Sequence, residues 1–322
     1  MNSFFALSDR KLKNLFCLQI VLRGHILKLC KMFCIGVGMR TVIYNKLTNN
    51  EIEEYLQGSD LIFLPVGVTE MHGALPVDCE TVLAQAISVE LAKRAGGLVL
   101  NDLAYFYAGA TVTGRGTLEV SIRAGIDYLY EILRSLVRQG FRRIVFVTFH
   151  APAYLTVSAA LRDFFDEYHI PMLYIDACKL SMSLARDPEF LKTGAIPAEF
   201  EMNDFFFGAY DILGRLSDIP LTTRDILDCS KGTNTTAKFA PFAKVGPMSG
   251  SHGFYSGDKQ DHAPTPVIKT EEERQARADR GRKVITSLSD YLGICKLVDL
   301  MNDLDEFNKE LISRTGDWLE FC

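Results

Sequence analysis

The sequence predicts an α/β protein: a single three-layer α/β/α domain around a mostly parallel central sheet. Two observations lead to this prediction. From Asp60 onward, short apolar runs alternate with longer amphipathic segments, which is typical of βαβ units. Glycines follow the amphipathic segments at 96–97 and at 140, as expected where a helix ends and the chain returns to a sheet. A chain of 322 residues is long enough to bury a sizeable core.

Four apolar runs predict the strands. The run LIFLPVG over 61–67 predicts a first buried strand, and LVLNDL over 98–103 predicts a second. The run RRIVFVTFH over 142–150 is the most strand-like segment of the chain because it is rich in β-branched and aromatic residues. A fourth strand is predicted for PMLYIDA over 171–177. Together these runs predict a central sheet of parallel strands.

The segments between and after the strands predict helices, because their apolar residues recur three or four positions apart. We expect helices over 81–97, 118–139, about 153–168, 198–214 and 271–293. The pattern weakens after residue 178, and residues 216–266 are rich in Gly, Pro, Ser and Thr. Long irregular regions often carry function, so this region is where we expect a lid or substrate loop.

The composition is that of an ordinary globular protein, with 48% hydrophobic and 23% charged residues. It excludes a disordered, collagen-like or disulfide-scaffold protein. The net charge of −5 divides into +5 for residues 1–38 and −10 for the remainder, and an acidic body argues against nucleic acid as a partner. Eight cysteines without a CxxC pair favour reduced thiols and a cytoplasmic location.

Residues 1–38 differ from the rest of the chain because they are basic and contain a short apolar run, residues 15–22. This run is too short to span a bilayer, so we expect no membrane association. One hypothesis is that the globular domain starts at Met39 and that residues 1–38 are a dispensable extension or an upstream translated region. A loose amphipathic helix and a targeting segment are the alternatives. We therefore divide the chain into an extension, 1–38, and a domain, 39–322.

Polar side chains follow two of the predicted strands. Glu70 and His72 come after the first strand, and His150 ends the strand at 142–150. The carboxyl ends of parallel strands meet at one edge of a sheet, so these residues can converge although they are about 80 positions apart. Carboxylates and imidazoles are ligands of zinc and manganese, and a carboxylate some ten residues later could bridge two ions. Alternatively, each is a structural residue, because isolated E-x-H patterns also occur by chance.

Several motifs carry a family resemblance. The segment LPVGVTEMHGALPVDCET, residues 64–81, resembles the creatininase family of metal-dependent amidohydrolases. Further similar segments are GRGTLEVS at 114–121, GFRRIVFVTFH at 140–150 and HGFYSGD at 252–258. The likeness covers most of 60–293 in the family's order. It implies a creatininase-like α/β metallohydrolase domain within 39–322.

The resemblance also implies a set of metal ligands. Glu70 and His72 match the family's first two ligands, and His150 matches the histidine at its strand end. Glu80 corresponds to the aspartate that bridges two ions. One residue of the family's H-L-P stretch is missing here, so Asp78 is the competing choice for that role.

Other positions match less well. Glu201, in the segment EFEMN, resembles a glutamate of the family's E-x-E-T-S motif, which implies a further ligand; the alternative is an acidic first helical turn favoured by the helix dipole. Residues 151–153, Ala-Pro-Ala, replace the family's Gly-Gly-Asn, and Ile196 replaces a histidine. The family's usual proton donor or substrate clamp is therefore missing. His252 is the candidate catalytic acid or base, and otherwise a surface-loop histidine.

The resemblance implies a reaction. It predicts a hydrolase that cleaves a cyclic or linear C–N amide bond of a small molecule with a metal-bound hydroxide, using two divalent ions of zinc, manganese or iron. It also implies a homo-oligomer, a hexamer in the family. A metal-dependent lyase or isomerase acting on a carbonyl substrate is one alternative. The other is a non-catalytic binding protein that retains the fold, which the replacements at Pro152 and Ile196 favour.

Overall fold

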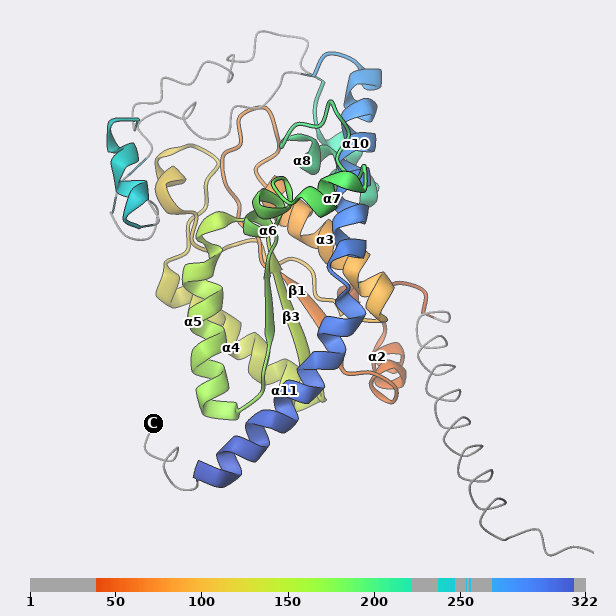
Figure 1. Cartoon of the computed structure of the whole chain (residues 1–322), viewed down its shortest axis with the longest axis vertical. Helices are drawn as coiled ribbons and strands as arrows, with labels where there is room; N and C mark the ends of the chain where they lie inside the picture. Colours follow the sequence, from red (N-terminus) through yellow and green to blue (C-terminus); the bar gives the residue numbers. More distant parts are fainter. Residues whose placement is uncertain (1–38, 222–236, 247–252, 254, 256–267, 316–322) are drawn as a thin grey trace, which may run out of the picture.

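The computed structural model describes residues 39–221, 237–246, 253, 255 and 268–315 (Figure 1). Its strands are β1 (Leu61–Pro65), β2 (Leu98–Val99), β3 (Arg143–Thr148) and β4 (Leu173–Asp176). Its α-helices are α2 (Asn49–Leu56), α3 (Cys79–Ala95), α4 (Ile122–Gln139), α5 (Tyr154–Tyr168), α6 (Ala177–Leu184), α7 (Pro188–Lys192), α8 (Asp204–Ile212), α10 (Glu271–Tyr291) and α11 (Ile294–Thr315). Short 3-10 helices are η1 (Tyr44–Lys46), η2 (Gly109–Thr113), η3 (Ala151–Ala153), η4 (Leu216–Asp218) and η6 (Ala237–Lys244).

The four described strands form one parallel sheet in the order β2-β1-β3-β4. Side chains alternate between its two faces, so each face contributes to a separate core. Phe63 and Val145 face a core built with α3, α8, α10 and α11, whereas Ile62 and Phe146 face a core built with α4 and α5. Figure 1 shows these helices on opposite sides of the strands. The α/β class and the three-layer arrangement are therefore confirmed.

Several predicted boundaries are corrected. The helix expected over 118–139 begins at Ile122, because the Ser121 hydroxyl caps it by accepting from the Ala124 amide at 3.3 Å. The helix expected over 198–214 begins only at Asp204, whose carboxylate accepts from the Glu201 amide at 3.1 Å in a preceding turn. The helices α6, α7 and α11 are additions that periodicity did not indicate.

Some predictions fall largely or wholly on residues that the structure does not describe. The basic extension over 1–38 lies outside the described residues. Most of the expected loop region over 216–266 also lies outside them, and its described part contains η4 and η6. Within the described part of the chain, no helix combines the length and the apolar character that a bilayer span requires.

Two glycines allow α8 and α10 to pack with their backbones in contact. A Cβ atom at Gly281 would overlap the carbonyl oxygen of Asp204, and one at Gly208 would overlap the backbone of Arg282. Beside this contact, the fully buried Asp204 carboxylate accepts from Arg277 Nη1 at 2.8 Å and from Arg280 Nε at 2.7 Å. These ion pairs and the close approach fix α8, which reaches the candidate site described below.

We predict that Gly281→Ala destabilises the fold by about 1–3 kcal/mol, because the added methyl group forces the two helices apart. Urea denaturation monitored by circular dichroism measures this change. Lys283→Ala, at an exposed position of the same helix, is the matched control and should change the stability by less than about 0.5 kcal/mol. Equal stability of Gly281→Ala and the native chain would contradict the packing described above.

Candidate metal centre

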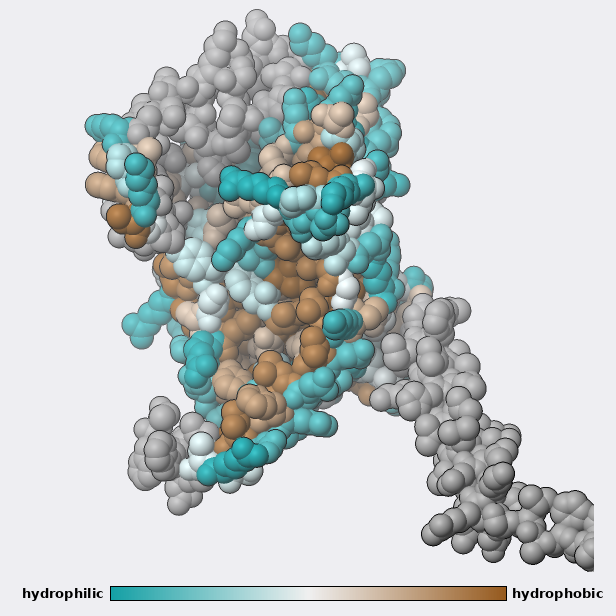
Figure 2. All heavy atoms as spheres, viewed as in Figure 1, coloured by the Kyte–Doolittle hydropathy of each residue, from teal (hydrophilic) through white to brown (hydrophobic). Residues whose placement is uncertain are grey.

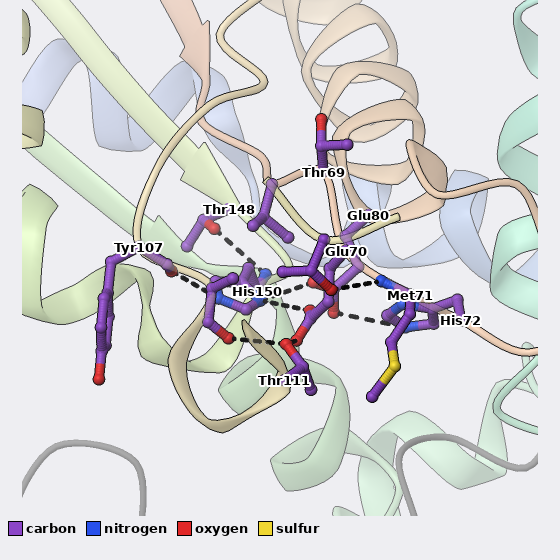
Figure 3. Close-up of polar contacts among 12 residues, drawn as sticks. Thr69, Glu70, Met71, His72, Glu80, Tyr107, Thr111, Thr148 and His150 are labelled. Atoms are coloured by element: carbon purple, nitrogen blue, oxygen red, sulfur yellow. Dashed lines mark hydrogen bonds and ion pairs between the residues drawn. The ribbon is translucent and has the colours of Figure 1, made fainter. Parts of the chain in front are cut away.

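Three buried polar side chains meet at the carboxyl edge of the sheet. Glu70 follows β1, His150 follows β3, and Glu80 lies in the first turn of α3. One possible ligand atom from each residue lies within 4.8 Å of the others. None of the three residues is more than 8% exposed, so the group is shielded from bulk water. Figure 3 shows the three side chains pointing toward one another.

The Glu80 carboxylate lies between two histidines. Its Oε2 is 2.6 Å from His150 Nδ1, and its Oε1 is 3.9 Å from His72 Nε2. A carboxylate that presents one oxygen to each of two imidazoles has the arrangement that a bridging ligand needs. Asp78, the competing choice, is engaged elsewhere: it accepts from the Tyr210 hydroxyl and from Arg215 Nη2. The structure thus brings Glu80 to the site and leaves Asp78 outside it.

Both ring nitrogens of His150 face oxygen acceptors. Nε2 donates to the Tyr107 carbonyl oxygen at 3.0 Å, and Nδ1 donates to Glu80. Burial alone would lower the pKa of His150, but the charge of Glu80 and its hydrogen bond outweigh burial and raise this pKa to about 9. The ring is therefore an imidazolium at neutral pH, and Nδ1 is the nitrogen that faces both carboxylates.

The two carboxylates of the group titrate in opposite directions. Burial, and then the charge of Glu80, raises the pKa of Glu70 to about 8. Burial would also raise the pKa of Glu80, but the charge and hydrogen bond of His150 outweigh it and lower this pKa to about 2. Burial lowers the pKa of His72, so that ring is a neutral imidazole. At neutral pH the proton on His150 therefore balances the charge of Glu80, while Glu70 keeps its own proton.

These residues fit a divalent cation. Two buried carboxylates in mutual repulsion, with imidazole nitrogens beside them, form a donor set that suits zinc, manganese or iron. A cation placed among them would relieve the repulsion that raises the pKa of Glu70. Metal ions bind deprotonated ligands, so the ion would take the place of the proton on His150 Nδ1.

A close backbone approach brings Glu70 and Glu80 together. A Cβ atom at Gly67, just after β1, would overlap Thr81 in the first turn of α3. The Thr81 hydroxyl donates to the Val68 carbonyl oxygen at 2.9 Å, which joins the two segments. Since only glycine fits at position 67, the strand-end loop lies directly against the helix that carries Glu80.

A second loop, residues 103–118, holds the segment that follows β1. The Gly67 amide donates to the Leu103 carbonyl oxygen at 2.8 Å, and the Leu118 amide donates to the Thr69 carbonyl oxygen at 2.9 Å. The Met71 amide donates to Thr117 Oγ1 at 3.1 Å. Thr117 belongs to the Gly-Thr pair of the segment 114–121 noted in the sequence. The sequence does not otherwise predict that this loop supports the site, because the contacts of the loop are made mainly by the backbone.

The remaining predicted site residues are not part of the group. The Glu201 side chain is 60% exposed, and its Oε2 accepts from Arg277 Nη1 at 2.8 Å. Arginines of α10 thus pair with acidic residues that precede α8. The assignment of Glu201 as a metal ligand stays a prediction. Ile196 packs against an apolar cluster that contains Phe190 and Leu288. His252 lies outside the described residues.

A buried carboxylate and histidine site at the edge of a parallel sheet defines a candidate metalloprotein, and comparisons with known proteins narrow the class. The family profile described as creatininase, creatinine amidohydrolase, matches residues 45–203. The 3-dehydro-scyllo-inosose hydrolase of Thermotoga maritima is 28% identical over 47% of this chain and 58% of its own length. The creatinine amidohydrolase of Pseudomonas putida is 30% identical over 34% of this chain and 45% of its own length. The chain thus spans about half the length of these curated relatives.

Solved structures show the same fold. A mutant creatininase complexed with creatine has a TM-score of 0.52 and 18% identity over 83% of this chain and 99% of its own. A creatininase designated Mn has a TM-score of 0.51 and 18% identity over 79% of this chain and 98% of its own. With the family profile and the curated relatives, these likenesses confirm the resemblance noted in the sequence. Residues 45–203 of the chain therefore form a creatininase-family domain, and its identity to the known members is low.

We predict that the metal-free protein loses stability as the pH rises from about 6.5 to about 9. The raised pKa values of Glu70, about 8, and His150, about 9, mean that both groups bind more protons in the folded chain than in the unfolded chain. Their stabilising effect is therefore present at low pH and is lost as the pH rises through these values. The lowered pKa of Glu80 acts oppositely, and its contribution is lost only as the pH falls below about 4.5.

Thermal unfolding at about pH 6 and about pH 9, with and without saturating Mn²⁺, measures this effect. The melting temperature of the metal-free protein should fall between the two pH values, and Mn²⁺ should abolish most of the fall because the ion replaces the protons. The same fall with and without Mn²⁺ would show that groups outside the site are responsible.

Proposed function

We propose that this protein is a metal-dependent hydrolase that cleaves the C–N amide bond of a small cyclic or linear molecule. The observation that carries the proposal is the buried group of Glu70, Glu80 and His150 at the carboxyl edge of the sheet. Membership of the creatininase family supports the amidohydrolase chemistry. The creatinine amidohydrolase of Pseudomonas putida is a relative whose name describes such a reaction.

The donor atoms suggest which residues hold the ions. Glu70, His150 Nδ1 and Glu80 Oε2 would hold one divalent ion, and His72 Nε2 with Glu80 Oε1 would contribute to a second. When bound, the ions supply an activated water and a Lewis acid that polarises a substrate carbonyl. The likeness to a creatininase designated Mn supports manganese as the first metal to test.

The chain's own residues orient the site and keep it dry. The hydrogen bond from His150 Nε2 to the Tyr107 carbonyl fixes the ring so that Nδ1 faces the carboxylates. The Phe206 ring packs edge-on against His72, with the ring centroids 5.3 Å apart, and restricts the rotation of that imidazole. We retain His252 as the proposed acid or base that transfers a proton to the leaving amine.

A second candidate function follows from the Thermotoga maritima relative, which is named as a hydrolase of 3-dehydro-scyllo-inosose. Under this alternative the substrate is a polyhydroxylated ring, and hydrolysis releases no amine. An assay for a newly formed amino group in the products separates the two functions. Both hydrolases place solvent oxygen in the product, but only amide cleavage also releases an amine.

We predict that Glu80→Gln removes most bound metal and lowers hydrolysis by at least about 100-fold, because it deprives both proposed ions of a shared anionic ligand. Metal content by mass spectrometry, together with hydrolysis of an amide substrate panel, measures this. Glu90→Gln, on the same helix α3 but paired with Arg94, is the control and should retain metal and activity. Undiminished metal content in Glu80→Gln would contradict the assigned site.

Glu201→Gln tests the remaining ligand prediction in the same assay. Loss of one of two ions would support Glu201 as a ligand of the second ion. Unchanged metal stoichiometry would restrict its role to the ion pair with Arg277.

We also propose a cytoplasmic homo-oligomer that acts on a small-molecule amide. Free thiols at Cys79, Cys178 and Cys295 support the location. The outer face of α11 supports the oligomer, because it carries an exposed apolar stripe with the heptad-like spacing of a helix interface. The stripe consists of Leu300, Leu304, Phe307 and Leu311, each 40–56% exposed. In Figure 2, hydrophobic residues also occupy the face between α5 and α11.

We predict that the double substitution Leu304→Lys and Phe307→Lys lowers the oligomeric state of the full chain, because charged side chains on the stripe oppose its burial between subunits. Size-exclusion chromatography with light scattering measures the mass. The control pair Asp303→Lys and Glu306→Lys introduces charge on an adjoining exposed face of the same helix. An oligomer that persists in the control but not in the stripe variant would support burial of the stripe between subunits. An unchanged mass in the stripe variant would contradict it.

A further inference from the structure

Thr111 is not one of the three grouped residues, but it contacts one of them, Glu70, directly. It belongs to η2, which begins at Gly109, where a φ of 79° lets the chain turn into the site. Thr111 is only 2% exposed, and its hydroxyl donates to Glu70 Oε1. The carbonyl oxygen of Ala108 is also near the hydroxyl, but at 3.3 Å. A hydroxyl has a single hydrogen to donate, and the closer of the two acceptors is Glu70.

The contact distinguishes the two oxygens of Glu70. Oε1 is held by Thr111, whereas Oε2 lies 3.4 Å from His150 Nδ1, on the side where the three ligand atoms gather. Figure 3 shows Thr111 on one side of the Glu70 carboxylate and His150 on the other. A hydrogen bond to one oxygen restricts the rotation of the carboxyl group about its last bond. The carboxylate therefore presents one defined oxygen to the site.

We propose that Thr111 is a positioning residue that makes Glu70 bind the metal ion through Oε2 alone. The inference rests on the proposed function only in requiring that the site holds a divalent ion. It adds that a hydroxyl from a different loop decides how one ligand binds. Without that hydroxyl, Oε1 loses its hydrogen-bond donor and the carboxylate is less well ordered, so the ion would be bound more weakly and with a changed geometry.

The anchoring of the loop explains how Thr111, 41 positions from Glu70 in the sequence, can orient the Glu70 carboxylate. The loop is fixed on both sides of Thr111, through Leu103 to Gly67 and through Leu118 to Thr69. In addition, a Cβ atom at Gly114 would overlap the Met71 side chain, so the loop lies directly against the residue after Glu70. The hydroxyl is thus presented from a rigid support, which is what a positioning role requires.

The test separates the hydroxyl of Thr111 from its shape. Thr111→Val keeps the shape and removes the hydroxyl, whereas Thr111→Ser keeps the hydroxyl and removes a methyl group. Mn²⁺ affinity by calorimetry and the visible absorption of bound Co²⁺ are measured on the full chain. We expect Thr111→Val to bind Mn²⁺ about 10- to 100-fold more weakly and to show an altered Co²⁺ spectrum. Thr111→Ser should stay within about threefold of the native chain and retain its spectrum.

The matched control is Thr113→Val, the same chemical change at an exposed position of the same loop, which should leave the affinity unchanged. Native affinity in Thr111→Val, or equal losses in Thr111→Val and Thr111→Ser, would overturn the proposal. If Thr111→Val does not fold, the comparison of Thr111→Ala with Thr111→Ser decides in the same way. A native chain that binds neither Mn²⁺ nor Co²⁺ would instead overturn the proposed function itself.

Discussion

The site depends on one electrostatic constraint: two carboxylates, Glu70 and Glu80, are buried side by side and need positive charge between them. In the metal-free chain this charge is the proton on His150 Nδ1, which is 2.6 Å from one acid and 3.4 Å from the other. Like charges held this close in a dry environment are costly unless a cation compensates them. This requirement makes a divalent ion the natural occupant and explains why the fold surrounds the group with hydrogen-bond partners.

The fold meets the constraint by bringing four separate segments to one edge of the sheet. The ends of β1 and β3 supply Glu70 and His150, the first turn of α3 supplies Glu80, and residues 103–118 hold the others in place. Glycines at 67 and 114 allow the closest approaches. The contact between α8 and α10 also fixes Phe206, whose ring packs beside His72. The precision of the site is therefore a property of the packing around it.

Much of this arrangement could be predicted from the sequence. Apolar runs of strand length gave the order of strands and helices, and the rule that ligands gather at the carboxyl ends of parallel strands brought Glu70 toward His150. The family resemblance favoured Glu80 over Asp78, and the structure adds that Asp78 contacts Tyr210 and Arg215 instead. The contacts of Thr111 and of the Tyr107 carbonyl left no pattern in the sequence, since long-range loop contacts have no periodicity. Glu201 matched a motif, yet its carboxylate contacts an arginine that is 76 residues away.

The most direct test of the account is a crystal structure of the full chain grown with Mn²⁺, with anomalous difference maps calculated at the manganese absorption edge. We expect an anomalous peak among Glu70 Oε2, Glu80 Oε2 and His150 Nδ1, with the second ion on the His72 side of Glu80. We also expect that the Nε2 hydrogen bond of His150 to the Tyr107 carbonyl is retained. A map without a peak at this group, at Mn²⁺ concentrations that saturate related metal sites, would show that Glu70, Glu80 and His150 do not form a metal site.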